Sequence, residues 1–167
     1  DTGTLTPPEP GEDPLPIRQW SQGDADFRGI EAEVTAHLLD DERGALDRRV
    51  FGDHVRGELD SGENLPRIAP SRFGLDLSWD TDRWRAALGA TRVLRQDDVA
   101  ADETETAGYT LVDAHFAWHW DTGNYGWEVF IDGNNLGDET ARVHTSFLKD
   151  NVVLPGRNFG LGVRLFF

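Results

Sequence analysis

Apolar and polar residues alternate with a period of two along most of this chain from Phe27 onward. Residues 158–167 are the clearest case, where mostly small or polar residues alternate with the apolar residues Phe159, Leu161, Val163 and Leu165. Such alternation is typical of a β-strand with one apolar and one polar face. It predicts an all-β fold of about seven antiparallel strands, at residues 27–38, 46–60, 72–80, 84–93, 108–120, 126–134 and 158–167.

The segment 46–60 departs from regular alternation, because Leu46 and Val50 have the opposite parity to Val55 and Leu59. A β-bulge adds one residue to a strand and so changes its parity. We therefore predict a bulge near Gly52, which places three further residues on the polar face: His54, Arg56 and Glu58.

The predicted connections alternate in length. Short turns lie at residues 81–83 and 121–125 and a middling one at 40–45, whereas the long loops are 61–71, 95–107 and 134–157. This alternation is typical of outer-membrane barrels, which have short turns on the periplasmic side. Residues 1–26 show no alternation and include five prolines, so we expect a solvated loop there.

Aromatic residues gather at one end of the predicted strands. When the chain is threaded with its short turns at one end, five of the six tryptophans fall at that end, together with Tyr125 and Phe167: Trp79, Trp84, Trp118, Trp120 and Trp127. A girdle of aromatic side chains is typical of a membrane interface, whereas a soluble core scatters its tryptophans. The pattern favours a transmembrane β-barrel over a soluble β-sandwich.

The opposite face of the predicted strands carries many charges, which would cost several kcal/mol each in a dry core. A wide, wet or plug-filled lumen tolerates them. Besides the three residues near the predicted bulge, they are Glu31, Glu33, His37, Asp76, Asp80, Arg85, Asp113, His115, His119, Glu128, Asp132 and Arg164.

Composition narrows the function classes. The net charge of −15 argues against an electrostatic nucleic-acid partner, and the absence of cysteine excludes disulfides and thiolate metal sites. No apolar run is long enough for a transmembrane helix, and the first residues do not form a signal peptide, so we expect the original N-terminus to be lost or processed. His144 and Ser146 lack an oriented base and oxyanion donors, so the sequence does not predict an enzyme.

Several segments resemble the C-terminal end of TonB-dependent outer-membrane receptors. The resemblance extends from about residue 27 to 167, with Phe167 as the expected native C-terminus. The segments that carry it, in order and at matching spacings, are residues 64–70, 105–114, 133–138, 144–150 and 154–159. The pair formed by 144–150 and 154–158 is similar to the branch that includes zinc-type receptors.

The resemblance implies that residues 27–167 supply the C-terminal strands of a barrel of about 22 strands, and that residues 1–26 are an extracellular loop segment. It also implies location in the outer membrane of a Gram-negative bacterium and contact with membrane lipid. The implied partners are the rest of the barrel, an N-terminal plug domain and TonB, which acts through an N-terminal part that this sequence does not contain. No resident cofactor is expected, although zinc or a metal chelate would be the transported substrate.

The loop 134–157 holds the candidate substrate-binding residues His144, Asp150, Glu139 and Asp138, with His144 as the candidate metal ligand. Imidazole and carboxylate groups suit zinc, and the acidic loop 95–107 would concentrate cations nearby. One histidine does not complete a site, so other ligands must come from elsewhere. The alternative is that residues 145–149 pack this loop over the barrel mouth.

The other histidines and turn motifs favour structural roles. His115 and His119 are four residues apart on one strand, roughly 13 Å when extended, which is too far for one ion. His37 and His54 flank one predicted hairpin and are candidates to approach each other. Residues 134–138 and 154–157 are typical turn sequences, and Arg157 is a candidate to pair with a carboxylate.

Three functions are compatible with these patterns. The first is a TonB-linked receptor that binds and imports a metal ion or metal chelate, of the zinc or siderophore type. The second is a passive outer-membrane channel or structural barrel fragment without active transport. The third is a fragment that only binds, for instance as a soluble immunogen.

Overall fold

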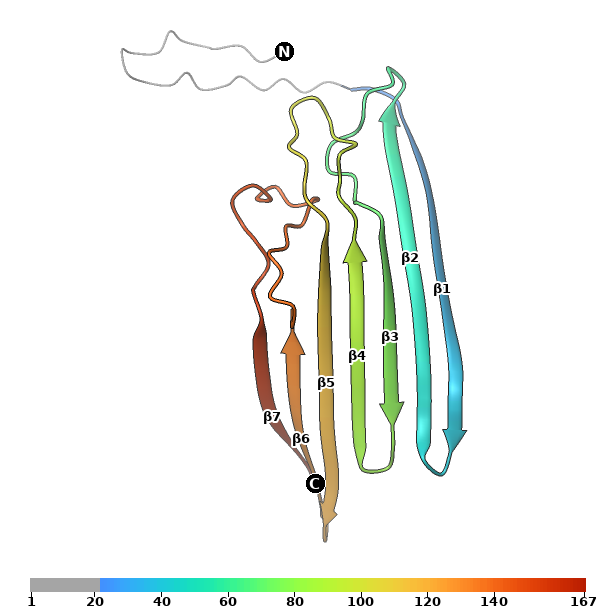
Figure 1. Ribbon diagram of the computed structural model, residues 1–167, viewed down its shortest axis with the longest axis vertical. Helices are drawn as coiled ribbons and strands as arrows, with labels where there is room; N and C mark the ends of the chain where they lie inside the picture. The colour runs from blue at the N-terminus through green and yellow to red at the C-terminus, as the bar shows by residue number, and fades with distance from the viewer. Residues whose placement is uncertain (1–21) are drawn as a thin grey trace, which may run out of the picture.

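The computed structural model describes residues 22–167, which form one antiparallel sheet of seven strands (Figure 1). The strands are β1 (Ala25–Asp41), β2 (Gly44–Leu59), β3 (Arg72–Asp80), β4 (Trp84–Val93), β5 (Tyr109–Thr122), β6 (Tyr125–Asn134) and β7 (Asn158–Phe166). Their order in the sheet is their order in the chain. All seven predicted strands are confirmed. Most of the predicted loop 1–26 lies outside the described residues, and its end already belongs to β1.

The sheet has one apolar and one polar face, both largely open. Leu161 lies opposite Ile131, which lies opposite Phe116, and these side chains are 78%, 45% and 40% exposed. On the other face Asp132 lies opposite His115. The only buried apolar residues within 22–167 are Tyr109, Ala117 and Ala141. A β-sandwich core is therefore absent from the described part of the chain.

The described residues, 22–167, contain no helix that could span a membrane.

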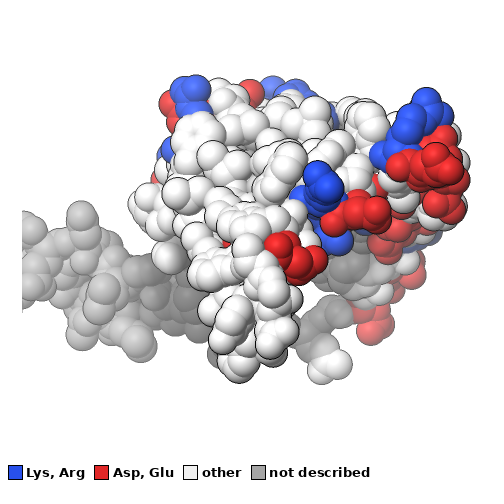
Figure 2. Space-filling model, turned by 90° about the horizontal axis from the view of Figure 1, so that it is seen from below, with Lys and Arg blue, Asp and Glu red and all other residues white. Residues whose placement is uncertain are grey.

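The short-turn end of the sheet gathers the aromatic side chains, as the sequence predicts. Trp79 and Trp84 meet edge to face with ring centroids 5.2 Å apart, and Trp120 stacks on Trp127 at 6.3 Å. Trp118 lies directly opposite Trp84 in the sheet. Seen from this end, uncharged side chains cover most of the surface, and the charged ones form separate groups (Figure 2). Indole rings at one level suit a membrane interface.

The predicted bulge near Gly52 is wrong. Gly52 pairs regularly with Ala32 and with Phe73, and the β1–β2 register shifts instead between His37 and Leu39. The parity of β2 is therefore constant around Gly52. His54, Arg56 and Glu58 lie on the same face as Leu46 and Val50, not on the polar face as predicted.

The change of polarity along β2 has a different physical cause. β2 extends beyond β3, because its pairing with β3 ends at Asp53 while its pairing with β1 continues to Leu59. The outward face of β2 becomes polar from His54 onward, beyond the end of its pairing with β3, while the side chains keep the same alternating direction. Such a change is expected where a barrel strand extends out of the membrane into water.

Candidate functional site

Three long loops meet at the end of the sheet opposite the short turns (Figure 1). They are the β2–β3 loop (residues 60–71), the β4–β5 loop (residues 94–108) and the β6–β7 loop (residues 135–157). Glu103 lies where they meet, since its carboxylate accepts a hydrogen bond from the backbone N–H of Arg67 at 3.0 Å and from Lys149 Nζ at 2.9 Å. The side chains of Glu103 and Lys149 are only 8% and 6% exposed. The buried carboxylate of Glu103 thus ties all three loops together.

His144 is enclosed beside this ion pair, with no exposed side-chain surface. Its Nδ1 lies 2.9 Å from the hydroxyl of Thr106 and 3.4 Å from Lys149 Nζ, while Nε2 lies 3.2 Å from Glu103 Oε1. An ammonium group only donates hydrogen bonds, so Nδ1 is the acceptor and the neutral ring carries its proton on Nε2. Nε2 faces the carboxylate without the geometry of a hydrogen bond.

Burial lowers the pKa of His144, and the ammonium of Lys149 lowers it further, while Glu103 and Asp150 act in the opposite direction. For Glu103, burial alone would raise the pKa. Hydrogen bonds from Lys149 and from two backbone amides outweigh burial and leave that pKa below its ordinary value. The cluster therefore favours a charged Glu103 carboxylate and a neutral His144 imidazole at neutral pH.

Further contacts hold the same loops. The guanidinium of Arg67 lies 3.1 Å from the ring centroid of Phe147, and Arg142 donates a 2.6 Å hydrogen bond to the carbonyl of Lys149. The hydroxyl of Thr104 donates to Asp150 at 2.6 Å. We call Glu103, His144, Lys149, Thr106 and Arg67 the loop junction.

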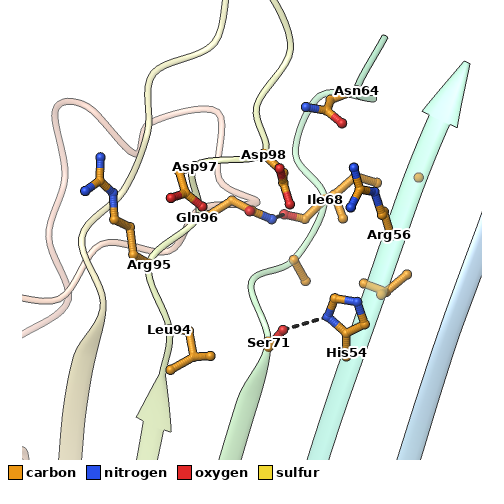
Figure 3. A pocket seen from close by; sticks show the side chains of 13 residues that line it. His54, Arg56, Asn64, Ile68, Ser71, Leu94, Arg95, Gln96, Asp97 and Asp98 are labelled. Carbon is orange, nitrogen blue, oxygen red and sulfur yellow. Dashed lines mark hydrogen bonds between the residues drawn. The ribbon is translucent and has the colours of Figure 1, made fainter. Parts of the chain in front are cut away.

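A cavity of about 200 Å³ lies next to the upper part of β2 (Figure 3). His54 closes its lower side through a 2.7 Å hydrogen bond between Nδ1 and the hydroxyl of Ser71. Gln96 crosses from the β4–β5 loop and donates to the carbonyl of Ile68 at 3.0 Å. The cavity therefore lies between β2 and the β2–β3 and β4–β5 loops.

The polar face of the sheet pairs its charges across neighbouring strands. Arg49 on β2 donates to Glu33 on β1 at 2.7 Å and to Asp76 on β3 at 2.8 Å. His115 Nδ1 lies 2.6 Å from a carboxylate oxygen of Asp132. These partly exposed pairs make a charged, hydrated wall and not a dry core.

The profile of the family described as TonB dependent receptor-like, beta-barrel matches residues 2–136, most of this chain. The chain belongs to this family. The sheet is accordingly a portion of a transmembrane β-barrel, as the sequence predicted. Its apolar face is the one that such barrels turn toward lipid.

One similar solved structure is described as "Copper transporter OprC". It is 22% identical, with a TM-score of 0.71, over 87% of this chain and 24% of that one. The present chain thus spans about a quarter of that protein. A likeness at this level of identity shows a shared fold alone.

The four predicted site residues of this chain lie in two groups. His144 belongs to the loop junction, and Asp150 lies beside it against Thr104. Asp138 instead accepts a 2.9 Å hydrogen bond from the backbone N–H of Arg157, and the backbone of Glu139 is bonded to the side chain of Asn135. Within residues 22–167 no three metal-ligating side chains converge. Metal binding by His144 stays a prediction, and it would require Lys149 to move away.

The other histidines have separate partners. His119 lies 3.3 Å from Asp121, so it does not share a site with His115, in agreement with the expectation from spacing. His37 pairs with Asp47 at 2.7 Å, whereas His54 lies seven residues further along β2 and on the other face. The predicted approach of His37 and His54 is therefore wrong. Arg157 pairs with Asp138 at 3.7 Å, as anticipated for a carboxylate partner.

The sequence alone does not identify the residues that hold the loop junction. Glu103 lies in the acidic loop 95–107, and Lys149 lies in the segment 144–150. The available signal was a lone lysine in the long loop opposite an acidic loop at the same end of the barrel.

Proposed function

We propose that this chain forms part of the wall and outer loops of an outer-membrane receptor that imports a metal ion or metal chelate. The observation that carries the proposal is a barrel sheet with a charged lumen face, covered at one end by three interlocked loops. The plug domain and the segment that contacts TonB belong to parts of the receptor beyond this chain. The receptor spans the outer membrane of a Gram-negative bacterium with its long loops outside.

The charge of the outer loops supports a cationic or metal-bound substrate. The β4–β5 loop carries the carboxylates of Asp97, Asp98, Asp102 and Glu105 next to the junction. Only Glu105 has a cationic partner, Arg95, among these four in the described residues. A negative potential at a barrel mouth raises the local concentration of cations and speeds their capture.

Zinc and ferric siderophores are the substrate classes that we propose to test first. His144 and Asp150 lie in the loop with a zinc-type resemblance, and zinc accepts imidazole and carboxylate ligands. In the closed loop arrangement, however, His144 faces a buried ammonium and not solvent. We propose that His144 becomes a ligand only in a rearranged loop state, and that Asp138 and Glu139 contribute at the rim.

Uptake by the full-length receptor tests the proposal. Cells that lack other uptake systems for the metal would be limited for zinc, copper or ferric siderophore, with and without functional TonB. We expect the receptor to restore growth and uptake of radioactive metal for one substrate, only with TonB. Uptake that is independent of TonB would indicate a passive channel, and no uptake of any metal form would refute the proposed substrate class.

His144→Ala separates a role in binding from one in import. If His144 is a ligand in the rearranged state, the substitution weakens zinc binding by the purified full-length receptor. Asp82→Asn, in the short turn at the other end of the barrel, is the control. Unchanged zinc affinity and uptake in His144→Ala would remove His144 from the substrate site.

A further inference from the structure

Arg48 is a charged residue on the lipid-facing surface. In β2 it lies between Leu46 and Val50 on the outward face, and its cross-strand neighbours are Ala36 on β1 and Leu77 on β3. The side chain is exposed. All four surrounding residues are apolar, so none of them offers an acceptor for the guanidinium.

The adjacent residue shows what an arginine on this strand does when acceptors are present. Arg49 points to the lumen and bonds two carboxylates, those of Glu33 and Asp76. Arg48 makes no hydrogen bond or ion pair with residues 22–167. An unpaired charge that faces hydrocarbon is costly unless the side chain reaches an interface or an anion.

The position of Arg48 brings its head group within reach of the interface. Leu46 pairs with Trp79, so the aromatic level of the short-turn end lies only two residues away along β2. Two strand residues span about 7 Å, which an extended arginine side chain covers. A membrane interface offers the phosphates of lipid head groups, whose geometry matches the planar fork of a guanidinium.

We propose that Arg48 binds the phosphate of a phospholipid in the leaflet at the short-turn end of the barrel. The acyl chain of that lipid lies along the outward side chains of β1 and β2. Ala32 and Ala36 on β1 and Gly52 on β2 have small side chains, so an acyl chain can approach the backbone there. The site needs one cation and an apolar flank, and both are present on the same face.

Lipid titration of the full-length receptor tests this site. The receptor would be purified in a non-ionic detergent without phosphate and titrated with phosphatidylglycerol or with diacylglycerol, which lacks the phosphate. Native mass spectrometry would count the bound lipids. The variants are Arg48→Leu, Arg48→Lys and the control Arg83→Leu, which removes an arginine from the β3–β4 turn at the same end.

We expect Arg48→Leu to bind phosphatidylglycerol about tenfold more weakly, equivalent to ~1.4 kcal/mol, with diacylglycerol binding unchanged. Arg48→Lys should lie between Arg48→Leu and the wild type, because lysine keeps the charge but not the bidentate geometry. Arg83→Leu should bind both lipids like the wild type. Equal binding of phosphatidylglycerol by Arg48→Leu and the wild type would overturn the proposal, and so would an equal loss of both lipids.

Thermal unfolding in the phosphate-free detergent gives a second readout. Arg48→Leu should unfold at the same or a higher temperature than the wild type there, because it removes a charge from an apolar band. A lower unfolding temperature in that detergent would reveal a protein carboxylate as the partner of Arg48, and would also contradict the lipid site.

Discussion

Removal of the ammonium at the loop junction should release the three outer loops while the barrel sheet stays folded. Lys149→Met keeps the length of the side chain but leaves Glu103, whose side chain is 8% exposed, without its cation. Breaking a buried ion pair from one side costs ~3–5 kcal/mol. Because both side chains retain slight exposure, we expect the lower end, ~3 kcal/mol, which is about a 100-fold change in an opening equilibrium.

Amide hydrogen exchange of the full-length receptor measures this loss directly. The informative amides are those of Arg67, which donates to Glu103, and of Gln96 and Thr106, which bond to each other's carbonyls. In Lys149→Met these amides should exchange about 100-fold faster. Amides in the central pairing of β4 with β5 should keep their rates.

Two further variants make the test specific. Lys149→Arg keeps the positive charge and should retain most of the protection. Glu103→Gln combined with Lys149→Met should cost less than the sum of the two single changes, since neither then leaves an unpaired charge. Loop amides in Lys149→Met that exchange as slowly as in the wild type would refute the reasoning that the ion pair holds the loops.

Two other predictions concern pH and the lipid face. Because the pKa of His144 is lowered in the folded junction, the unfolded loops bind more protons than the folded junction below about pH 6.5. Protection of the junction amides against exchange is therefore complete above that pH and falls as the pH drops toward the lowered pKa. His144→Gln should remove this pH dependence, and an unchanged pH profile in the variant would assign it to another group. Val163, 62% exposed on the outward face of β7, should not tolerate a charge. Val163→Arg should destabilise the assembled barrel by ~2–4 kcal/mol if residue 163 lies near the membrane midplane, and heat-resistant gel mobility and the denaturant midpoint would measure this loss against Val163→Leu. Wild-type assembly of the arginine variant would contradict the proposed topology.

The sequence alone determined the strands and which face of most of them is apolar. A barrel wall separates lipid from a hydrated lumen, so every second residue must be apolar, and this constraint is visible in Phe159, Leu161 and Val163 without any knowledge of contacts. Placing all the short turns at one end of the strands also predicted that Trp79, Trp84 and three further tryptophans gather there. These features depend on the local environment of each strand, and the alternation of apolar and polar residues along the strand reflects that environment.

The tertiary structure decided the features that depend on pairing and depth. The faces of His54 and Arg56 could not be assigned from polarity, because polarity on β2 changes where the strand leaves the apolar band, while the bulge lies elsewhere, near Leu38. The sequence also did not reveal which residue contacts His144 and Lys149. Glu103 precedes Lys149 by 46 residues, on a different loop. Only the order of the strands in the sheet brings those loops together, and Glu103 is buried there against Lys149 and His144.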